Sequence, residues 1–325
     1  MASDATYFLD EKSKKRYQRQ RIAFNILTYT FLTLCALFML IPFYYMIVTS
    51  LKDVETINTE LSTHTIKLFP SFKNLTLQNY RIAIYGQEAT PKTFAEGNFL
   101  RYFANTIFVA ICSTAITVVT SVLSAFAFAR LNFKGKNLLF TLLLSTMMIP
   151  GEMMIITNFN TIKSINWDNS YQALIITHAV SVFYIYYLRQ TFQQIPNELF
   201  LAAKVDGYGV FKYLWKVMIP IAMPTIVTII ILCVMGSWNA YMWPTMILSS
   251  NSPLKLVANG LMDSFTALNG TSTSDYLREL GYSIPDGLNA IKLAGSFMVT
   301  LPLFIFFLIF RKYIMRGVSR SGIKG

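Results

Sequence analysis

Aromatic and amide side chains interrupt one long apolar stretch, 218–247, where polar residues are costly and therefore point to function. Its segment SWNAYMWP offers both ring faces and an amide. Sugars favour this combination, because their C–H faces stack on rings while their hydroxyls form hydrogen bonds. The candidates for contact with such a substrate are Trp238, Asn239, Tyr241 and Trp243. An aromatic belt at a membrane interface explains the tryptophans nearly as well.

Glu152 is a second candidate for the substrate path. It follows Pro150-Gly151 within the apolar stretch 138–161. A break in a helix there frees backbone groups, so that a carboxylate can line a cavity and accept hydrogen bonds from substrate hydroxyls. A structural or interfacial role, a pairing with a basic side chain, and a proton or cation site are the alternatives.

Other chemistry has little support in the sequence. His64 and His178 lie too far apart for a metal-ligand pair at helical spacing, and Cys35, Cys112 and Cys233 each fall inside an apolar run, where buried thiols are the expectation. No phosphate loop of the form G-x-x-x-x-G-K-[ST] occurs. We therefore predict no catalytic residue, no metal and no cofactor bound by this chain, and we disfavour a membrane enzyme.

The elements that position these residues are membrane helices. Hydrophobic residues make up 54% of the chain and charged residues only 14%, which lies outside the range of soluble domains. Lipid offers backbone groups no hydrogen-bond partner, so each apolar run should be helical. We expect an all-α polytopic membrane protein with six transmembrane helices, at 23–50, 103–129, 138–161, 172–188, 218–247 and 289–310.

The distribution of basic residues predicts the orientation. Lys and Arg concentrate in the N-terminal tail, in the connections after the second and fourth spans, and in the C-terminal tail. Six spans put these four segments on one side, and basic segments stay in the cytoplasm. Both termini are therefore predicted to be cytoplasmic, and the net charge of +12 reflects topology rather than nucleic-acid binding.

The organisation follows from this topology. We expect a cytoplasmic tail at 1–22, a six-helix transmembrane domain at 23–310 with a cytoplasmic loop at 190–217, and a second cytoplasmic tail at 311–325. The two long external connections, 51–102 and 248–288, should hold loops and short helices. They either contact an external partner or cap the bundle.

The cytoplasmic loop reads as helix, turn, helix. Pro196 and Asn197 begin a helix, with Asn197 expected to cap free N–H groups, and Asp206-Gly207 ends it, because glycine readily takes a left-handed conformation. A second helix then leads from about Val210 to Pro220 and into the membrane. Leu199, Phe200 and Leu201, with the small Ala202 and Ala203, give the first helix an apolar surface that neither lipid nor the bundle is positioned to cover. We expect a partner to cover it, with Phe200, Leu201 and Ala203 among the residues buried against that partner.

This loop resembles the "EAA" loop of binding-protein-dependent ABC importer permeases. The match covers Glu198-Leu199, Ala202-Ala203, Asp206-Gly207 and Pro220. The segments SAFAFARLNFKGK, MIPGEMM, SWNAYMWP and GVSRSGIKG resemble the carbohydrate-uptake branch of that family, especially its maltose-type and glycerol-phosphate-type permeases. The chain departs from the motif at Leu201, where the family has Glu, and at Tyr208, where it has a small residue.

The resemblance implies a permease subunit that translocates a carbohydrate by alternating access in a bacterial cell membrane. An oligosaccharide is the first choice of substrate, ahead of glycerol phosphate or a polyol. Its partners would be a second permease, two ATPase subunits that carry ATP and Mg²⁺, an extracytoplasmic solute-binding protein and membrane lipid. The residues implied to couple to an ATPase are Glu198, Phe200, Leu201, Ala202, Ala203, Asp206, Gly207 and Pro220. Two alternatives remain, an interfacial hairpin that only stabilises the bundle and an ion-coupled secondary transporter that uses Glu152.

Overall fold

The fold, known from a computed structural model, is helical. The structure describes residues 11–69, 74–85, 99–267, 277–283 and 286–319. Within them, β pairing is limited to an isolated bridge between Lys52 and Leu75. The predicted all-α class is confirmed, whereas the ends of both predicted tails, 1–10 and 320–325, lie outside the described residues.

Four helices in the described part are long and apolar enough to cross a membrane, and two bent pairs pass the same test. The four are α1 (Glu11–Ser50), α4 (Phe99–Arg130), α10 (Val210–Tyr213) continued through α11 (Ile219–Trp238), and α15 (Asn289–Ser319). The pairs are α5 (Lys136–Thr146) with α6 (Gly151–Ser164), bent by 96°, and α7 (Tyr171–Ile175) and η2 (Ile176–His178) with α8 (Val182–Gln193), bent by 42°. Counting each pair as one span gives the six predicted.

Two predicted spans are less regular than the sequence suggested. The stretch 172–188 is not one helix, because Ser181 begins a new one: its Oγ accepts a hydrogen bond from the backbone N–H of Tyr184 at 3.4 Å. The stretch 218–247 is not one helix either. The α11 helix ends at Trp238, and a separate short helix, α12 (Met242–Ile247), follows.

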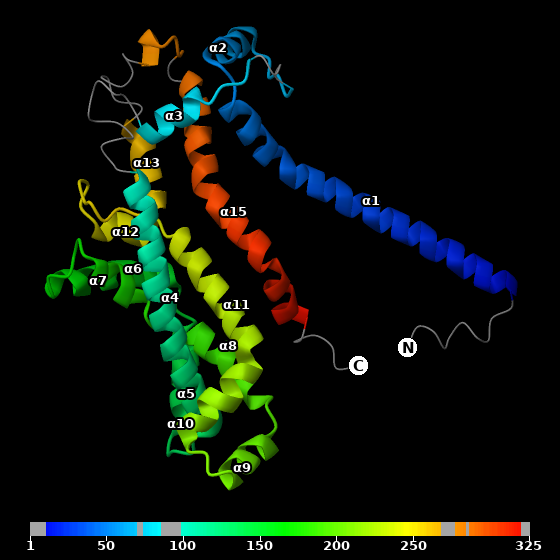
Figure 1. The fold of residues 1–325 in the computed structure, drawn as a ribbon, viewed down its shortest axis with the longest axis vertical. Coiled ribbons are helices and arrows are strands. Elements are labelled where there is room, and N and C mark those ends of the chain that lie inside the picture. The colour runs from blue at the N-terminus through cyan, green and yellow to red at the C-terminus, as the bar shows by residue number, and fades with distance from the viewer. Residues whose placement is uncertain (1–10, 70–73, 86–98, 268–276, 284–285, 320–325) are drawn as a thin grey trace. The chain divides into compact units, whose positions relative to one another are not determined.

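The chain divides into two compact units. One comprises residues 81–280 with 295–325, and in it α8 and α11 both pack along α4 (Figure 1). Its main core includes Phe126 of α4, Leu188 and Phe192 of α8, and Ile229 of α11. These apolar side chains come from segments far apart in sequence, so their burial fixes the positions of the polar residues between them.

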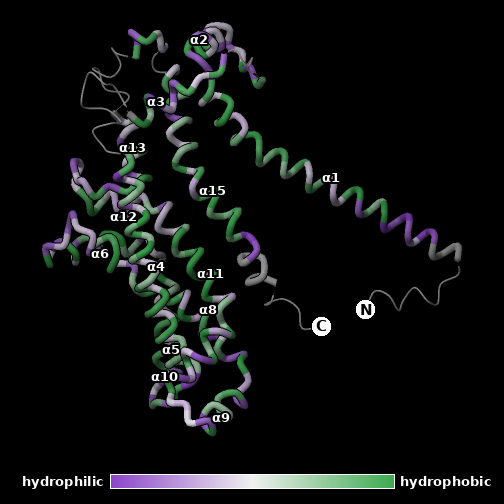
Figure 2. The backbone as a smooth tube through the Cα atoms, in the orientation of Figure 1, coloured by the Kyte–Doolittle hydropathy of each residue, from purple (hydrophilic) through white to green (hydrophobic). Residues whose placement is uncertain are grey.

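The other unit comprises residues 1–80 with 281–294. Its helix α1 is hydrophilic near its N-terminal end and largely hydrophobic beyond (Figure 2), and no residue of its apolar window is buried. The short helix α2 (Val54–Thr63) follows, and α3 (Gln78–Tyr85) begins in this unit and ends in the other. Buried Lys52 forms an ion pair with Glu60 at 2.8 Å, and Asn79 joins the backbone at Lys52 to the hydroxyl of Tyr282. The first long connection therefore contains short helices, as predicted.

Candidate functional site

A cavity of about 340 Å³ lies within the unit of residues 81–280 with 295–325. This volume is within the range of about 300–1,000 Å³ that small-molecule sites occupy. The side chains that line it come from α4, α7, η2, α8, α11, α12 and the connections beside them. They are Val109, Ser113, Thr117, Leu174, Thr177, His178, Val180, Ser181, Tyr184, Leu232, Cys233, Gly236, Ser237, Ala240, Trp243, Pro244 and Leu256.

The α4 side of the cavity presents hydroxyls. Val109, Ser113 and Thr117 follow one another at four-residue spacing, which puts them on one face of the helix. The Thr117 hydroxyl donates to the backbone carbonyl of His178 at 2.9 Å. Ser113 is 5% exposed, and its Oγ has no hydrogen-bond partner among the described residues. An unpaired buried hydroxyl costs about 1–3 kcal/mol, so Ser113 is ready to bond a polar ligand.

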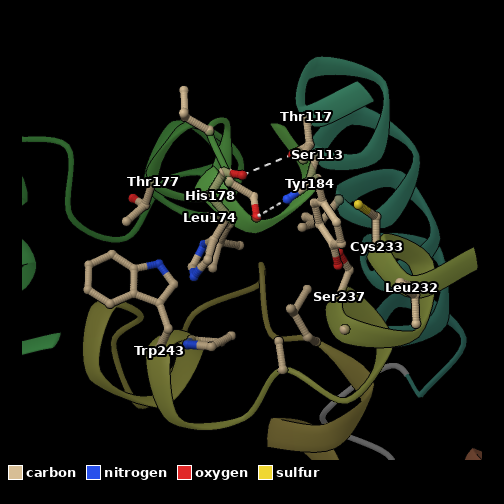
Figure 3. Close-up of a pocket in the computed structure, with 17 residues that line it drawn as sticks. Ser113, Thr117, Leu174, Thr177, His178, Tyr184, Leu232, Cys233, Ser237 and Trp243 are labelled. Atoms are coloured by element: carbon tan, nitrogen blue, oxygen red, sulfur yellow. Dashed lines mark hydrogen bonds between the residues drawn. The ribbon is translucent and has the colours of Figure 1, made fainter. Parts of the chain in front are cut away.

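Aromatic rings form another wall. Trp243 is 7% exposed, and its indole N–H donates to the carbonyl of Ala173 at 3.0 Å, which holds the ring in place. The ring of His178 lies beside it, with the centroids 6.2 Å apart. Figure 3 shows these two rings near each other, with Tyr184 and Ser237 across the cavity. The wall can therefore offer ring surface to a ligand without losing the indole hydrogen bond.

The lining of this cavity includes no Asp, Glu, Lys or Arg side chain. Its polar groups are hydroxyls, one imidazole, one thiol and backbone carbonyls. In a cavity without charged side chains, such groups bind uncharged hydroxyls at a lower desolvation cost than they bind an ion, because an ion requires a matching charge. The arrangement suits a neutral, polyhydroxylated ligand.

Only one of the five predicted substrate-path residues, Trp243, lines the cavity. Trp238 is packed inside the unit, where its indole N–H donates to the carbonyl of Val299 at 3.1 Å. Asn239 is the C-cap residue of α11; it is exposed, and its side-chain amide donates to the carbonyl of Met235 at 3.0 Å. Their proximity in sequence to Trp243 does not place them in the same site.

Tyr241 and Glu152 also lie outside this cavity. Tyr241 is 42% exposed. Glu152 is exposed in the first turn of α6, just after the 96° break that the Pro150-Gly151 sequence predicted. It makes no hydrogen bond or ion pair with the described residues. The cavity residues that sequence reasoning missed include Ser113 and Thr117. Their signal was the four-residue spacing that puts both hydroxyls on one face of α4.

The predicted helix-turn-helix is present. The first helix is α9 (Asn197–Val205), and the expected cap is wrong: Pro196 occupies the N-cap position, and Asn197 is the first helical residue. The end is as predicted, because Gly207 has φ +73°. The N–H of Tyr208 donates to the carbonyl of Ala203 at 2.8 Å and that of Gly207 to Lys204 at 3.1 Å, which is the Schellman pattern. A residue with a side chain at Gly207 would cost about 1–2 kcal/mol.

One face of α9 is covered by this chain itself, which corrects the expectation for two residues. Ala203 is 6% exposed within the main core, and Phe200 packs against that core with its ring 5.0 Å from the ring of Tyr213. The opposite face is open: Leu201 is 55% exposed and Val205 is 88% exposed, with Glu198 and Ala202 also exposed. The spacing of 198, 201, 202 and 205 places these four residues on one face, which we call the open face of α9.

Arg130, the last residue of α4, connects that helix to the start of α9. Its guanidinium donates to the carbonyl of Phe192 at 3.0 Å, to the carbonyl of Ile195, and to the side chain of Asn197 at 3.5 Å. From the sequence, Arg130 was expected only to contribute to the basic residues that set the orientation. One side chain thus bonds three positions across the junction between α8 and α9, at the end of the helix that carries Ser113.

Two residues of the predicted coupling set, Asp206 and Pro220, remain to be placed. Asp206 is the C-cap of α9 and is exposed. Pro220 lies beyond the loop, in the first turn of α11, and the helix that begins at Val210 continues through it to Trp238, as predicted. A π-helical turn, η3 (Leu214–Met218), precedes it. Proline has no N–H to donate, and an irregular turn at this point accommodates that loss.

Comparisons with known proteins identify the class. The crystal structure of a bacterial ABC transporter involved in the import of the acidic polysaccharide alginate contains a chain of the same fold, with a TM-score of 0.75 and 22% identity over 95% of this chain and 99% of that one. A polytopic helical membrane protein is therefore the class that the fold defines.

The family follows from the sequence. "Binding-protein-dependent transport system inner membrane component" matches residues 117–320, and the chain belongs to this family. The arabinooligosaccharides transport system permease protein AraQ of Halalkalibacterium halodurans is 31% identical over 82% of this chain and 86% of that protein. The polygalacturonan/rhamnogalacturonan transport system permease protein YtcP of Bacillus subtilis is 28% identical over 93% and 98%. This chain is thus a multi-pass inner-membrane component of an ABC importer and a transport component rather than an enzyme.

Proposed function

We propose that this chain is a permease subunit that translocates a carbohydrate, with an oligosaccharide as the first choice, and that the 340 Å³ cavity forms part of the path. The observation that carries the substrate class is the lining: a fixed tryptophan ring, several hydroxyls and no Asp, Glu, Lys or Arg. Relatives described as permeases for arabinooligosaccharides and lactose support the same class. Each feature alone is common, but together they match the mixed apolar and hydroxyl surface of a sugar.

The rest of the assembly is part of the proposal. A second permease completes the path, a solute-binding protein delivers the substrate, and two ATPase subunits hold ATP and Mg²⁺. Both termini and α9 then lie in the cytoplasm, as the basic residues predict. A solved complex of an alginate ABC transporter with its pentasaccharide-bound periplasmic protein supports the delivery step. The ion-coupled alternative is not favoured, because the family is binding-protein-dependent.

The open face of α9 is proposed to dock on an ATPase subunit. Leu201 and Val205 present apolar side chains that this chain leaves exposed, and the small side chain of Ala202 between them permits close approach. Glu198 lies on the same face, three residues before the position where the family motif has its Glu. Phe200 and Ala203 lie on the opposite face of α9 and support docking indirectly, because they hold the helix against the core.

Two measurements test the proposed function. Proteoliposomes that hold the chain with its second permease, ATPases and solute-binding protein should take up arabinotriose, lactose or trigalacturonate only when ATP is inside. Uptake of none of them would contradict the carbohydrate assignment. Uptake by this chain alone, driven by an ion gradient, would favour the secondary transporter.

The docking proposal has its own test. A cysteine at position 205 should crosslink to an ATPase subunit in the assembled complex, whereas a cysteine at position 203 should not, because the core of this chain covers it. Crosslinks from 205 that form only within this chain would favour the interfacial hairpin instead.

A further inference from the structure

A second cavity, of about 380 Å³, lies on the other side of α12 from the first. Pro244 lines both cavities, while its neighbour Trp243 lines only the first and its neighbour Thr245 only the second. Three consecutive residues of one short helix therefore separate two cavities. The second is lined by Pro244, Thr245, Leu248, Ser249, Ser250, Lys255, Asn259, Asp263 and Thr266.

Asn259 is the central polar group of this second cavity. It is 4% exposed, and its amide N–H₂ donates to the carbonyl of Tyr241 at 3.1 Å and to the hydroxyl of Thr245. Its Oδ1 is buried and has no hydrogen-bond partner in the part of the chain that the structure describes. A buried acceptor left unpaired costs about 1–3 kcal/mol, and a ligand hydroxyl would remove that cost.

The charges in the lining are already matched. Lys255 forms an ion pair with Asp263 at 2.5 Å, so an incoming anion would have to compete with Asp263 for the ammonium group. Ser249, Ser250 and Thr266 add hydroxyls that both donate and accept. The lining thus offers hydrogen bonds of both kinds with no net charge, which suits a neutral polyhydroxylated ligand.

Helix α4 holds the segment that forms this site. The Asn105 amide donates to the carbonyls of Pro253 and Lys255 at 2.9 and 3.0 Å. The Thr106 hydroxyl accepts from the N–H of Val257, the first residue of α13 (Val257–Ala267), at 2.8 Å. These bonds position Lys255 and Asn259 independently of any ligand, so the second cavity is preformed rather than a gap in a loose loop.

We propose that the second cavity is a binding subsite for an uncharged polyhydroxylated ligand, consecutive with the first cavity across α12. The inference rests on the proposed function, which makes this ligand the transported carbohydrate. The ligand would donate a hydroxyl to Asn259 Oδ1, and the same asparagine holds α12 through Tyr241 and Thr245. Occupancy of the subsite is thereby linked to the helix that separates the two cavities.

The test is protection of a cysteine placed in the subsite. In a variant whose three native cysteines are replaced by alanine, Ser250→Cys places a thiol at an exposed position in the lining, and Ser164→Cys is a matched control that is exposed but lines neither cavity. The complete transporter with its solute-binding protein is labelled with a maleimide, with and without arabinotriose, lactose or trigalacturonate, and uptake is measured in parallel.

We expect a neutral sugar that the complex takes up to slow labelling at position 250 by at least about threefold and to leave position 164 unchanged. Equal labelling with and without the transported sugar would overturn the subsite. Slowing by the solute-binding protein without sugar would also overturn it, because the partner alone would then cover the site. Protection by trigalacturonate and by no neutral sugar would overturn the uncharged class. Failure of the proposed function is distinguishable, because it appears as absence of uptake.

Discussion

The α9 hairpin and the first cavity belong to the same unit, but they are built in opposite ways. The hairpin is a run of consecutive residues whose turn is set by Gly207 and by two backbone hydrogen bonds to Ala203 and Lys204. The side chains that line the cavity come from positions between 109 and 256. Their positions depend mainly on the packing of α8 and α11 along α4. The α9 hairpin should therefore be sensitive to changes at its turn. The first cavity should be sensitive to changes in the helices that support its lining.

Two neighbouring alanines of α9 give the sharpest test of this comparison, with the largest expected effect. Ala203→Asp should lower the stability of the permease by several kcal/mol, because it buries an unpaired carboxylate in the core. Ala202→Asp lies on the open face and should leave the permease folded while weakening ATPase association. Thermal unfolding in detergent and co-purification of the ATPases separate the two. Equal stability of both variants would contradict the division of α9 into two faces.

Arg130 joins the two regions, and its replacement tests whether they communicate. Arg130→Ala removes charged hydrogen bonds to the α8–α9 junction, worth about 1.5–3 kcal/mol each. We expect transport to fall about tenfold relative to ATP hydrolysis, while a cysteine at 205 still crosslinks to the ATPase.

Arg189→Ala is the matched control for this change. The Arg189 guanidinium donates to the carbonyl of Phe128 at 3.2 Å and lies over the ring of Phe140, so these interactions connect α8 to α4 and α5 and not to α9. Its loss should leave the ratio of transport to hydrolysis close to normal. A similar fall in both variants would mean that general loosening of α4 is the cause.

The smallest expected effect concerns the cavity hydroxyls. Ser113→Ala should raise the apparent KM for the transported sugar about three- to tenfold, the equivalent of one hydrogen bond of about 0.5–1.5 kcal/mol. Thr114→Val removes the neighbouring hydroxyl, which is equally without a partner in the described residues but does not line the cavity. Uptake kinetics should distinguish the pair, and an equal KM for both variants would remove Ser113 from the path.

The sequence alone determined the class of fold and the local geometry of the loop. Long apolar runs can satisfy their backbone groups in lipid only as helices, and the Asp206-Gly207 pair ends α9 because glycine accepts a positive φ. These features depend on residues close in the chain, so composition and spacing are enough to predict them. The match to the family motif around Glu198 and Ala202 is local for the same reason.

Only the tertiary structure decided which side chains share a site. Trp238 and Trp243 are five residues apart in one polar segment, yet the end of α11 sends Trp238 toward Val299 and Trp243 toward Ala173. Ala203 seemed to need a partner, yet the core of this chain covers it. Such outcomes depend on contacts between residues distant in sequence, because burial is decided by what packs against a face and not by the pattern of the face itself.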